Sequence, residues 1–197
     1  MRYTVKRQSV LDFDKAEIAK IDKYVWGGEY RPEAYAKLVL VEGEGFALQM
    51  TCMESEPLAV YKNFDDPVWK DSCLEFFASF NNASPLYMNL EMNSAGAFLM
   101  GIRTSRENKR SAAEIVALPP VKATKDEGFW RVEYMISFEI IEKLFGKTEL
   151  KSGSVFKGNF YKCGDDTAVP HFGSWAPIGT EKPDFHRPEY FGELVIE

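Results

Sequence analysis

Strict alternation of apolar and polar residues in short runs constrains the fold of this chain more than any other feature. In YMNLEMN (87–93), two methionines and a leucine take one side, and the other side carries Tyr87, Asn89, Glu91 and Asn93. The same period of two recurs in three further runs: FALQMTC (46–52), CLEFFASF (73–80) and FWRVEYMISF (129–138). Side chains alternate across a β-strand with this period, and turn signals such as EGEG and NNASP separate the runs. The chain is therefore predicted to be all-β, an antiparallel β-sandwich.

Two short segments are predicted to be helical, and one strand is predicted at a sheet edge. In LDFDKAEIAKIDKYVW (11–26), isoleucines and a valine recur at helical spacing after Asp14, a candidate N-cap. SFEIIEKLFG (137–146) opens with a serine cap and ends at a glycine. EIVALPPVKA (114–123) contains two prolines, which cannot donate to a central sheet ladder, so it is predicted to form an edge strand.

The length and the lack of internal boundaries predict one domain, residues 1–197. A chain of 197 residues can bury roughly 70% of its unfolded surface and needs no disulfide or metal to fold. Its cysteines, Cys52, Cys73 and Cys163, are odd in number and without C-x-x-C spacing, as is typical of a reducing compartment. The N-terminus lacks an apolar stretch like a signal peptide, which favours the cytoplasm, but a trimmed export signal would leave the same sequence. Localisation and oligomeric state stay open.

The charge balance and the lack of a long apolar run argue against two classes of partner, nucleic acid and the membrane interior. A net charge of −6 and a pI near 5.2 do not suit nucleic acid, which calls for a basic face. The one basic run, RTSRENKR (103–110), is interpreted as a solvated loop between strands. No run of eighteen apolar residues is present, so no membrane span is predicted.

The polar side of residues 87–93 is the first candidate binding surface. It presents Tyr87 followed by Asn89, Glu91 and Asn93, and Glu75 points out of a strand that is expected to lie nearby. Amides and carboxylates can bind vicinal hydroxyls, and flat rings can stack on the C–H faces of sugars. This mixture suits a neutral, polyhydroxylated ligand, while a solvated face with cross-strand hydrogen bonds is the alternative.

A second candidate is NFDDPVWKDS (63–72), which surrounds Trp69 with aspartates. A tryptophan in a loop is costly unless something covers it, so Trp69 is either a stacking platform or a cap on the end of the sandwich. The aspartates either form turns or bind calcium, although their spacing is not that of an EF-hand. The candidate calcium ligands are Asp65, Asp66 and Asp71.

Enzymatic interpretations are the alternative class. Glu75 and Glu91 are candidates for the acid and base of a glycoside hydrolase, which needs two carboxyls about 5–10 Å apart. Cys163 and His171 are candidates for a nucleophile and its base. No Walker, Rossmann, G-x-S-x-G or H-E-x-x-H motif occurs.

Together these stretches resemble the family 9 carbohydrate-binding modules and family 9-like proteins of polysaccharide-degrading bacteria. The resembling blocks keep the family's order and span more than half of the chain: DDPVWKDSCLEFF (65–77), YMNLEMNSAGAF (87–98), WRVEYMISFEII (130–141), NFYKCGD (159–165) and HFGSWAPIGTEKPDFHRPEYFGELVI (171–196). The resemblance implies an immunoglobulin-like or jelly-roll sandwich related to DOMON domains. It also implies non-catalytic recognition of a glycan or sugar terminus in support of polysaccharide breakdown, beside a glycan-degrading enzyme.

In sugar-binding members two aromatic rings hold the sugar, and the resemblance assigns these rings to Trp69 and to Phe185 or His186. Where those members carry an arginine beside the site, this chain has Glu91. The family's later amide ligands have Asn159 and Tyr161 as their nearest counterparts. The predicted ligand-binding residues are thus Trp69, Glu75, Tyr87, Asn89, Glu91, Asn159, Tyr161, Phe185 and His186. No cofactor is predicted, since the methionine–histidine pairing of haem-binding DOMON proteins is not evident. A sandwich that binds a protein partner and no small ligand is the remaining alternative.

Overall fold

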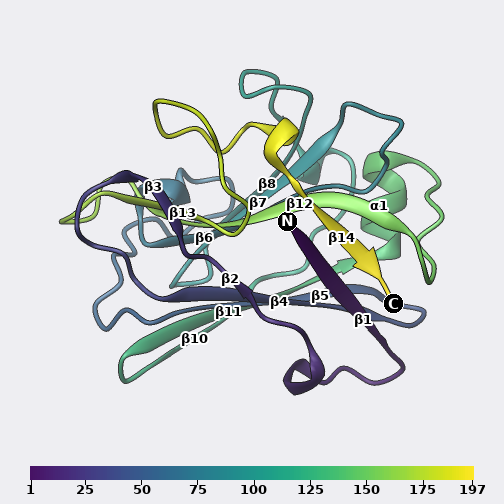
Figure 1. Cartoon of the computed structure of the whole chain (residues 1–197), viewed down its shortest axis with the longest axis horizontal. Coiled ribbons are helices and arrows are strands. Elements are labelled where there is room, and N and C mark those ends of the chain that lie inside the picture. Colours follow the sequence, from purple (N-terminus) through teal and green to yellow (C-terminus); the bar gives the residue numbers. More distant parts are fainter.

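The computed structural model describes residues 1–197 as two β-layers packed face to face, with one α-helix at an end (Figure 1). The first layer joins β4 (Ala34–Val41), β5 (Gly45–Cys52), β10 (Lys122–Asp126) and β11 (Phe129–Ser137), with β2 (Ala19–Lys20) on β4. The second joins β6 (Cys73–Ser79), β7 (Tyr87–Asn93), β8 (Phe98–Arg103), β9 (Arg110–Ser111), β12 (Val155–Gly164) and β14 (Gly192–Ile196), with β13 (His171–Ser174) and β3 (Lys23–Gly27) beside β12. The prediction of an all-β sandwich is confirmed.

The two layers are joined by β1 (Arg2–Gln8), which belongs to both. Its first half pairs in parallel with β14, from Arg2 to Val5, and its second half pairs in parallel with β4, from Lys6 to Gln8. All other strand pairs are antiparallel, and most join neighbours in sequence, such as the β4–β5 hairpin through the EGEG turn. The sandwich is therefore antiparallel except along this one strand, which curls the sheet around the core.

The main core lies between the layers and follows the alternation of the strands. It contains 37 buried residues, among them Phe46, Phe76 and Phe160, which come from β5, β6 and β12. The inward side of β7, with its methionines, belongs to this core, as the pattern predicts. The α-helix α1 (Phe138–Phe145) closes one end of the sandwich. Ser137 accepts a hydrogen bond from the backbone N–H of Ile140, and Gly146 ends the helix at a φ of 75°.

A second, smaller core covers the opposite side of β6, β7 and β12. Twelve buried residues form it, including Phe77, Tyr87, Tyr161 and Phe185, and it lies beneath the segment that precedes β14. The 3₁₀ turn η4 (Pro188–Tyr190) leads this segment into β14. The side of β7 that the pattern assigns to the outside is therefore buried, as is every other residue of β7. In Figure 1 this segment is the yellow loop above β13.

The predicted helix at 11–26 is wrong. This segment forms a 3₁₀ turn, η1 (Phe13–Lys15), and then the short strands β2 and β3, which pair with β4 and β13. Asp12, rather than Asp14, caps the turn by accepting the N–H of residue 14. Of the residues at helical spacing, Ile21 is buried but Ile18 and Val25 are exposed, so pairing with β4 and β13 overrides the local spacing.

The predicted edge strand at 114–123 is wrong except for its last two residues, which belong to β10 (Lys122–Asp126). A 3₁₀ turn, η3 (Ala112–Glu114), and an irregular segment that includes both prolines occupy most of it, and β10 begins only at Lys122. β10 pairs with β11 alone, so it is the edge of its layer. The prolines end the pairing because they have no N–H to donate.

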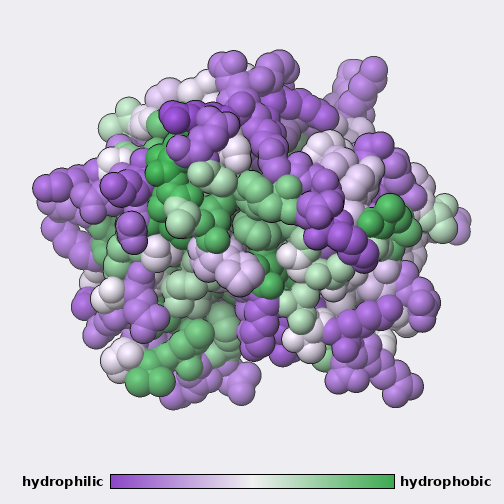
Figure 2. Space-filling view, turned by 180° about the vertical axis from the view of Figure 1, so that it is seen from behind, coloured by the Kyte–Doolittle hydropathy of each residue, from purple (hydrophilic) through white to green (hydrophobic).

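The surface carries hydrophilic side chains around its outline and a group of more apolar side chains near the middle of the face seen in Figure 2. The alternative of a protein-binding sandwich depends on such a surface, and it stays a prediction. The only α-helix has eight residues, and no helix of the chain has the length and hydropathy to cross a membrane.

Candidate functional site

A pocket of about 250 Å³ opens on the second-layer side that faces away from the main core. Its floor comes from β6, β7 and β12, and its walls come from the 3₁₀ turn η2 (Val68–Lys70), the end of β8 and the loop before η4. It combines four acidic residues, two arginines, three aromatic residues, a histidine, a cysteine and a proline. These are Trp69, Glu75, Glu91, Arg103, Arg106, Cys163, Asp165, Phe172, Pro183, Asp184, Phe185 and His186.

Two glutamates form the floor. Glu75 on β6 and Glu91 on β7 are direct cross-strand partners and are only 2% and 3% exposed. Burial, with the neighbouring Cys163 and Glu91, raises the pKa of Glu75 well above its usual range. Burial also raises the pKa of Glu91 to about 7, although the amide of Asn89 and the charge of Arg103 act in the opposite direction. The floor can therefore present one carboxyl as a donor and another as an acceptor near neutral pH.

A chain of hydrogen bonds links this floor to a buried arginine. Asn89 donates from Nδ2 to Glu91 Oε1 at 2.8 Å, and Arg103 donates from Nε to Asn89 Oδ1 at 2.9 Å. Arg103 also donates to the carbonyl of Arg106. Gly101 provides the room for this arrangement, because a Cβ there would lie 2.6 Å from Asn89 Oδ1. Arg103 is thereby held in one orientation at the pocket wall.

The interpretation of 103–110 as a solvated loop is wrong for its first residue. Arg103 ends β8, is only 9% exposed and lines the pocket. Its side chain lies on the same side of the sheet as Tyr87, its cross-strand partner. The sequence places Glu91 where the family's arginine was expected, and the structure supplies an arginine from the adjacent strand.

The aromatic walls come from segments far apart in the sequence. Trp69, on η2, is 38% exposed and is the most accessible ring of the pocket. Phe185 is nearly buried and stacks on Tyr161, with ring centroids 4.1 Å apart and an angle of 8° between the rings. Because Tyr161 belongs to β12, this stack fixes the position of the Phe185 ring against the sheet.

His186 completes the wall as a neutral imidazole. Its Nδ1 lies 3.1 Å from Tyr87 Oη, and its ring packs 5.0 Å from that of Phe77. Burial, with the charges of Arg103 and Arg106, lowers its pKa to about 3. A neutral ring keeps both a donor and an acceptor nitrogen near pH 7.

The loop that carries Phe185 and His186 is held by Asp184. Its Oδ1 accepts from Arg106 Nη1 at 3.2 Å and from the backbone N of His186 at 3.1 Å. These contacts tie the loop before η4 to the loop after β8, so the two sides of the pocket are joined across its rim.

The nine predicted ligand-binding residues divide into two groups. Five line the pocket: Trp69, Glu75, Glu91, Phe185 and His186. Four lie behind it and contact those five or the backbone: Tyr87, Asn89, Asn159 and Tyr161. Asn159 makes two hydrogen bonds to the backbone of Ala176: its Oδ1 accepts from the N–H at 2.8 Å, and its Nδ2 donates to the carbonyl at 2.9 Å. Whether any of the nine contacts a ligand stays a prediction.

Seven pocket residues were not among the predicted ligand-binding residues, and of these only Cys163 had been a candidate, as a nucleophile: Arg103, Arg106, Cys163, Asp165, Phe172, Pro183 and Asp184. A signal for Arg103 was present, because continuing the alternation of β7 through the next hairpin places it on the side of Asn89 and Glu91. The sequence contains no comparable signal for the loop residues, because their positions depend on how loops far apart along the chain fold together.

The aspartates proposed as calcium ligands do not come together. Asp71 accepts from the backbone N–H groups of Val60 and Tyr61 at 2.9 and 3.0 Å, and Asp66 accepts from the N–H of Asn63 at 2.9 Å. Asp65 pairs with Lys109. Asp71 and Asp66 thus brace the loop before β6, Asp65 ties that loop to the loop after β8, and the structure gives calcium at these residues no support.

The proposed Cys163–His171 pair does not form. His171 lies inside the sandwich, where its Nε2 is 2.6 Å from Lys162 Nζ. Cys163 points to the other side of β12, where its thiol donates to Glu75 Oε1 at 2.9 Å. Because neighbouring residues on a strand face opposite sides, the base cannot reach the thiol.

The structure is thus a β-sandwich with a pocket of polar groups and aromatic walls. The family model of Carbohydrate-binding family 9 matches residues 6–196, and the chain belongs to this family. A comparison with curated proteins finds no match.

Three solved structures are similar over the whole chain. One is a protein of Bacteroides uniformis ATCC 8492 with a provisional carbohydrate-binding assignment, at 27% identity and a TM-score of 0.81, with 100% of this chain and 99% of that chain covered. The other two are structures of a family 9 carbohydrate-binding module from Caldicellulosiruptor kristjanssonii, both at 12% identity. Its complex with cellotriose has a TM-score of 0.71, covering 100% of this chain and 94% of that chain. Its complex with glucose has a TM-score of 0.70, with 100% of this chain and 96% of that chain covered. At 12% identity these two show the shared fold.

Proposed function

We propose that the chain binds a carbohydrate in this pocket, without changing it, between Trp69 and Phe185. The observation that carries the proposal is the composition of the pocket: aromatic rings stand beside buried carboxyls, an arginine and a neutral imidazole. Sugar rings offer vicinal hydroxyls, which the polar groups can bind, and apolar C–H faces, on which the aromatic rings can stack. The similar modules in complex with cellotriose and glucose support the proposal.

Each wall has its own part in this proposal. Trp69 stacks on one face of the sugar and Phe185, supported by Tyr161, lies against the other. Glu75, Glu91 and His186 bind hydroxyls directly, and Arg103 does so from the wall. Tyr87, Asn89 and Asn159 orient these groups from behind, since their own polar atoms are engaged with His186, Glu91 and the backbone of Ala176.

The size of the pocket favours a sugar terminus over a long chain. Its volume of about 250 Å³ lies below the roughly 300–1,000 Å³ of sites for drug-sized ligands. We infer that residues 1–197 form one binding domain, because the pocket draws on strands and loops from both halves of the chain. Such a domain fits a role beside a glycan-degrading enzyme. By binding sugar termini it would keep that enzyme near the ends of polysaccharide chains.

Isothermal titration against glucose, cellotriose and a panel of other mono- and oligosaccharides tests the proposal. The wild type is expected to release heat with at least one sugar, and Trp69→Ala is expected to bind it about 5- to 30-fold more weakly. That change corresponds to about 1–2 kcal/mol for the apolar contact of one indole ring.

Phe64→Ala is the matched control, because Phe64 is 40% exposed, close to the 38% of Trp69, and does not line the pocket. This variant should bind like the wild type. Absence of heat with every sugar in a folded sample, or equal weakening in both variants, would contradict the proposal.

A second candidate function, glycoside hydrolysis, is favoured by one observation. Glu75 and Glu91 face each other on neighbouring strands and line the same pocket. Incubating the protein with the sugar that binds and measuring new reducing ends separates the two functions. Under binding alone no product forms and Glu91→Gln weakens affinity modestly, whereas under hydrolysis product forms and Glu91→Gln abolishes it.

A further inference from the structure

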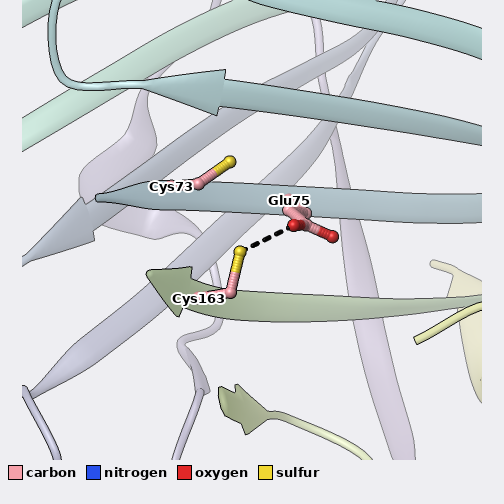
Figure 3. A group of neighbouring side chains, drawn as sticks. All are labelled: Cys73, Glu75 and Cys163. Carbon is pink, nitrogen blue, oxygen red and sulfur yellow. Dashed lines mark hydrogen bonds between the residues drawn. The ribbon is translucent and has the colours of Figure 1, made fainter. Parts of the chain in front are cut away.

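Three side chains at the pocket floor bring their ligand atoms to one point. Cys73 and Glu75 lie two residues apart on β6 and share a face, and Cys163 on β12 is the cross-strand partner of Cys73. The two sulfurs and a carboxylate oxygen all lie within 4.8 Å of one another. Figure 3 shows the Cys163 thiol on β12 directed at Glu75 on β6. Cys73 lies on the same strand as Glu75. This is the chain's one such cluster of histidine, cysteine and acidic side chains.

The cluster is buried but can be reached from the pocket. Cys73, Glu75 and Cys163 are 0%, 2% and 2% exposed, and the latter two line the pocket. No lysine or arginine pairs with Glu75, and its side chain receives a single hydrogen bond, from the Cys163 thiol. A thiol is a weak donor, so this buried carboxyl lacks the partners that buried acidic groups ordinarily have. Because Glu75 lines the pocket, a ligand there can reach its carboxyl.

The ligand atoms define which ligand would fit. Two sulfurs and one carboxylate oxygen suit a borderline or soft cation, while calcium requires oxygen ligands throughout. A tetrahedral zinc ion, with Zn–S bonds of about 2.3 Å, holds two thiolates about 3.8 Å apart. The observed spread of up to 4.8 Å closes to that geometry through small side-chain movements.

We propose that Cys73, Glu75 and Cys163 form a binding site for Zn²⁺ or a similar thiophilic divalent cation at the floor of the pocket. The protein supplies three ligands, and the fourth position faces the pocket, where water or another small ligand completes the coordination. When the metal binds, the two thiols and the carboxyl give up their protons to the solvent, and the ion with its three anionic ligands carries one net negative charge. Arg103 and Arg106 line the same pocket and offset that charge. The metal site needs no sugar, and with the metal bound Glu75 ligates the ion in place of a sugar hydroxyl.

Titration with Co²⁺ and then Zn²⁺, in a phosphine reductant and without sugar, tests the site. One equivalent of Co²⁺ is expected to produce the thiolate-to-cobalt charge-transfer band and the intense visible bands of a tetrahedral ion. Zn²⁺ should then displace the cobalt and bleach these bands. Zn²⁺ should also raise the melting temperature, because it binds only the folded state, and Ca²⁺ at the same concentration should not.

Variants of the three cysteines locate the metal. Cys73→Ser and Cys163→Ser are expected to lose the charge-transfer intensity and to bind Zn²⁺ at least about tenfold more weakly, and Glu75→Gln is expected to weaken binding while keeping both thiolates. Cys52→Ser is the matched control, since Cys52 is also fully buried but lies outside the cluster. A spectrum without thiolate bands, or equal Zn²⁺ affinity in the folded Cys73→Ser, Cys163→Ser and control variants, would overturn the proposal. So would equal stabilisation by Ca²⁺.

Discussion

Replacing Lys162 with methionine is expected to lower the free energy of unfolding by about 3–5 kcal/mol, the loss typical of breaking one side of a buried ion pair. The Lys162 side chain is fully buried inside the sandwich. Its Nζ lies 3.6 Å from Glu54 Oε2 and 2.6 Å from His171 Nε2, and it donates to the carbonyl of Cys163 at 2.8 Å. Methionine fills much of the same space but leaves Glu54 without a counter-charge.

The environment of Glu54 explains why the loss should be large. Burial acts to raise its pKa, but the charge of Lys162 and the hydrogen bonds from Trp130 and Ser72 outweigh burial and lower it. Those bonds, of 3.0 Å from Trp130 Nε1 and 3.1 Å from Ser72 Oγ, hold the carboxylate in place. With Lys162 removed, the protein must either bury an unpaired charge or protonate Glu54, and each costs free energy.

Urea denaturation followed by tryptophan fluorescence measures this loss. Lys157→Met is the matched control, because Lys157 is an exposed lysine of the same strand, and it should change stability by no more than about 0.5 kcal/mol. Adding Glu54→Gln to Lys162→Met should recover part of the loss, since no unpaired charge then remains. A loss below about 1 kcal/mol in Lys162→Met would show that the pair does not stabilise the fold.

Arg103→Met is expected to weaken carbohydrate binding by roughly 10- to 100-fold, which corresponds to the loss of one hydrogen bond from a charged donor. This follows from the proposed function and from the chain of hydrogen bonds that runs from Arg103 through Asn89 to Glu91. The guanidinium charge opposes the effect of burial on Glu91, so removing it should raise the pKa of Glu91 further. The variant loses both a donor to the ligand and the orientation of the Asn89 amide.

Arg110→Met is the control for this variant. Arg110 belongs to the same basic run but is exposed and pairs with Glu114 on the surface. Calorimetric titration should show wild-type affinity for Arg110→Met and a large loss for Arg103→Met, with both variants folded by circular dichroism. Equal sugar affinities of the two variants would mean that Arg103 has only a structural role.

The strands and the side on which each side chain lies could be predicted from the sequence, because a period of two is a local property of the chain. The runs that became β5, β7 and β11 place their apolar residues in the main core, and α1 follows its N-cap Ser137 and ends before Gly146. These features depend on neighbours within a few residues, which the sequence displays directly.

Burial of the polar side of β7 could not be predicted in the same way. Asn89 and Glu91 are buried because the loop that carries Phe185 and His186 folds over them, and nothing in the strand itself indicates that cover. The buried state of Lys162 likewise depends on Glu54, which comes from a different part of the chain. The pocket forms where these distant segments meet, so the sequence could identify Trp69, Phe185 and the two glutamates but not their arrangement.

The resemblance to family 9 contributed the part of the site that periodicity could not. It selected Phe185 and His186 and supported Trp69, already a candidate from its own loop, and the structure brings all three to one pocket. It did not indicate Arg103, because Glu91 was aligned with the family's arginine. The relation to DOMON domains and a role in polysaccharide breakdown stay predictions.

The most direct test of carbohydrate binding in this pocket is an NMR titration that follows the tryptophan indole N–H signals. The chain has four tryptophans, and Trp69 is assigned by the signal that disappears in Trp69→Phe. With a bound sugar, the Trp69 signal is expected to shift in a saturable way, while those of Trp130 and Trp175, which are buried in the main core, stay in place. Saturable binding that leaves the Trp69 signal unmoved, or that shifts the core signals instead, would contradict a sugar site at this pocket.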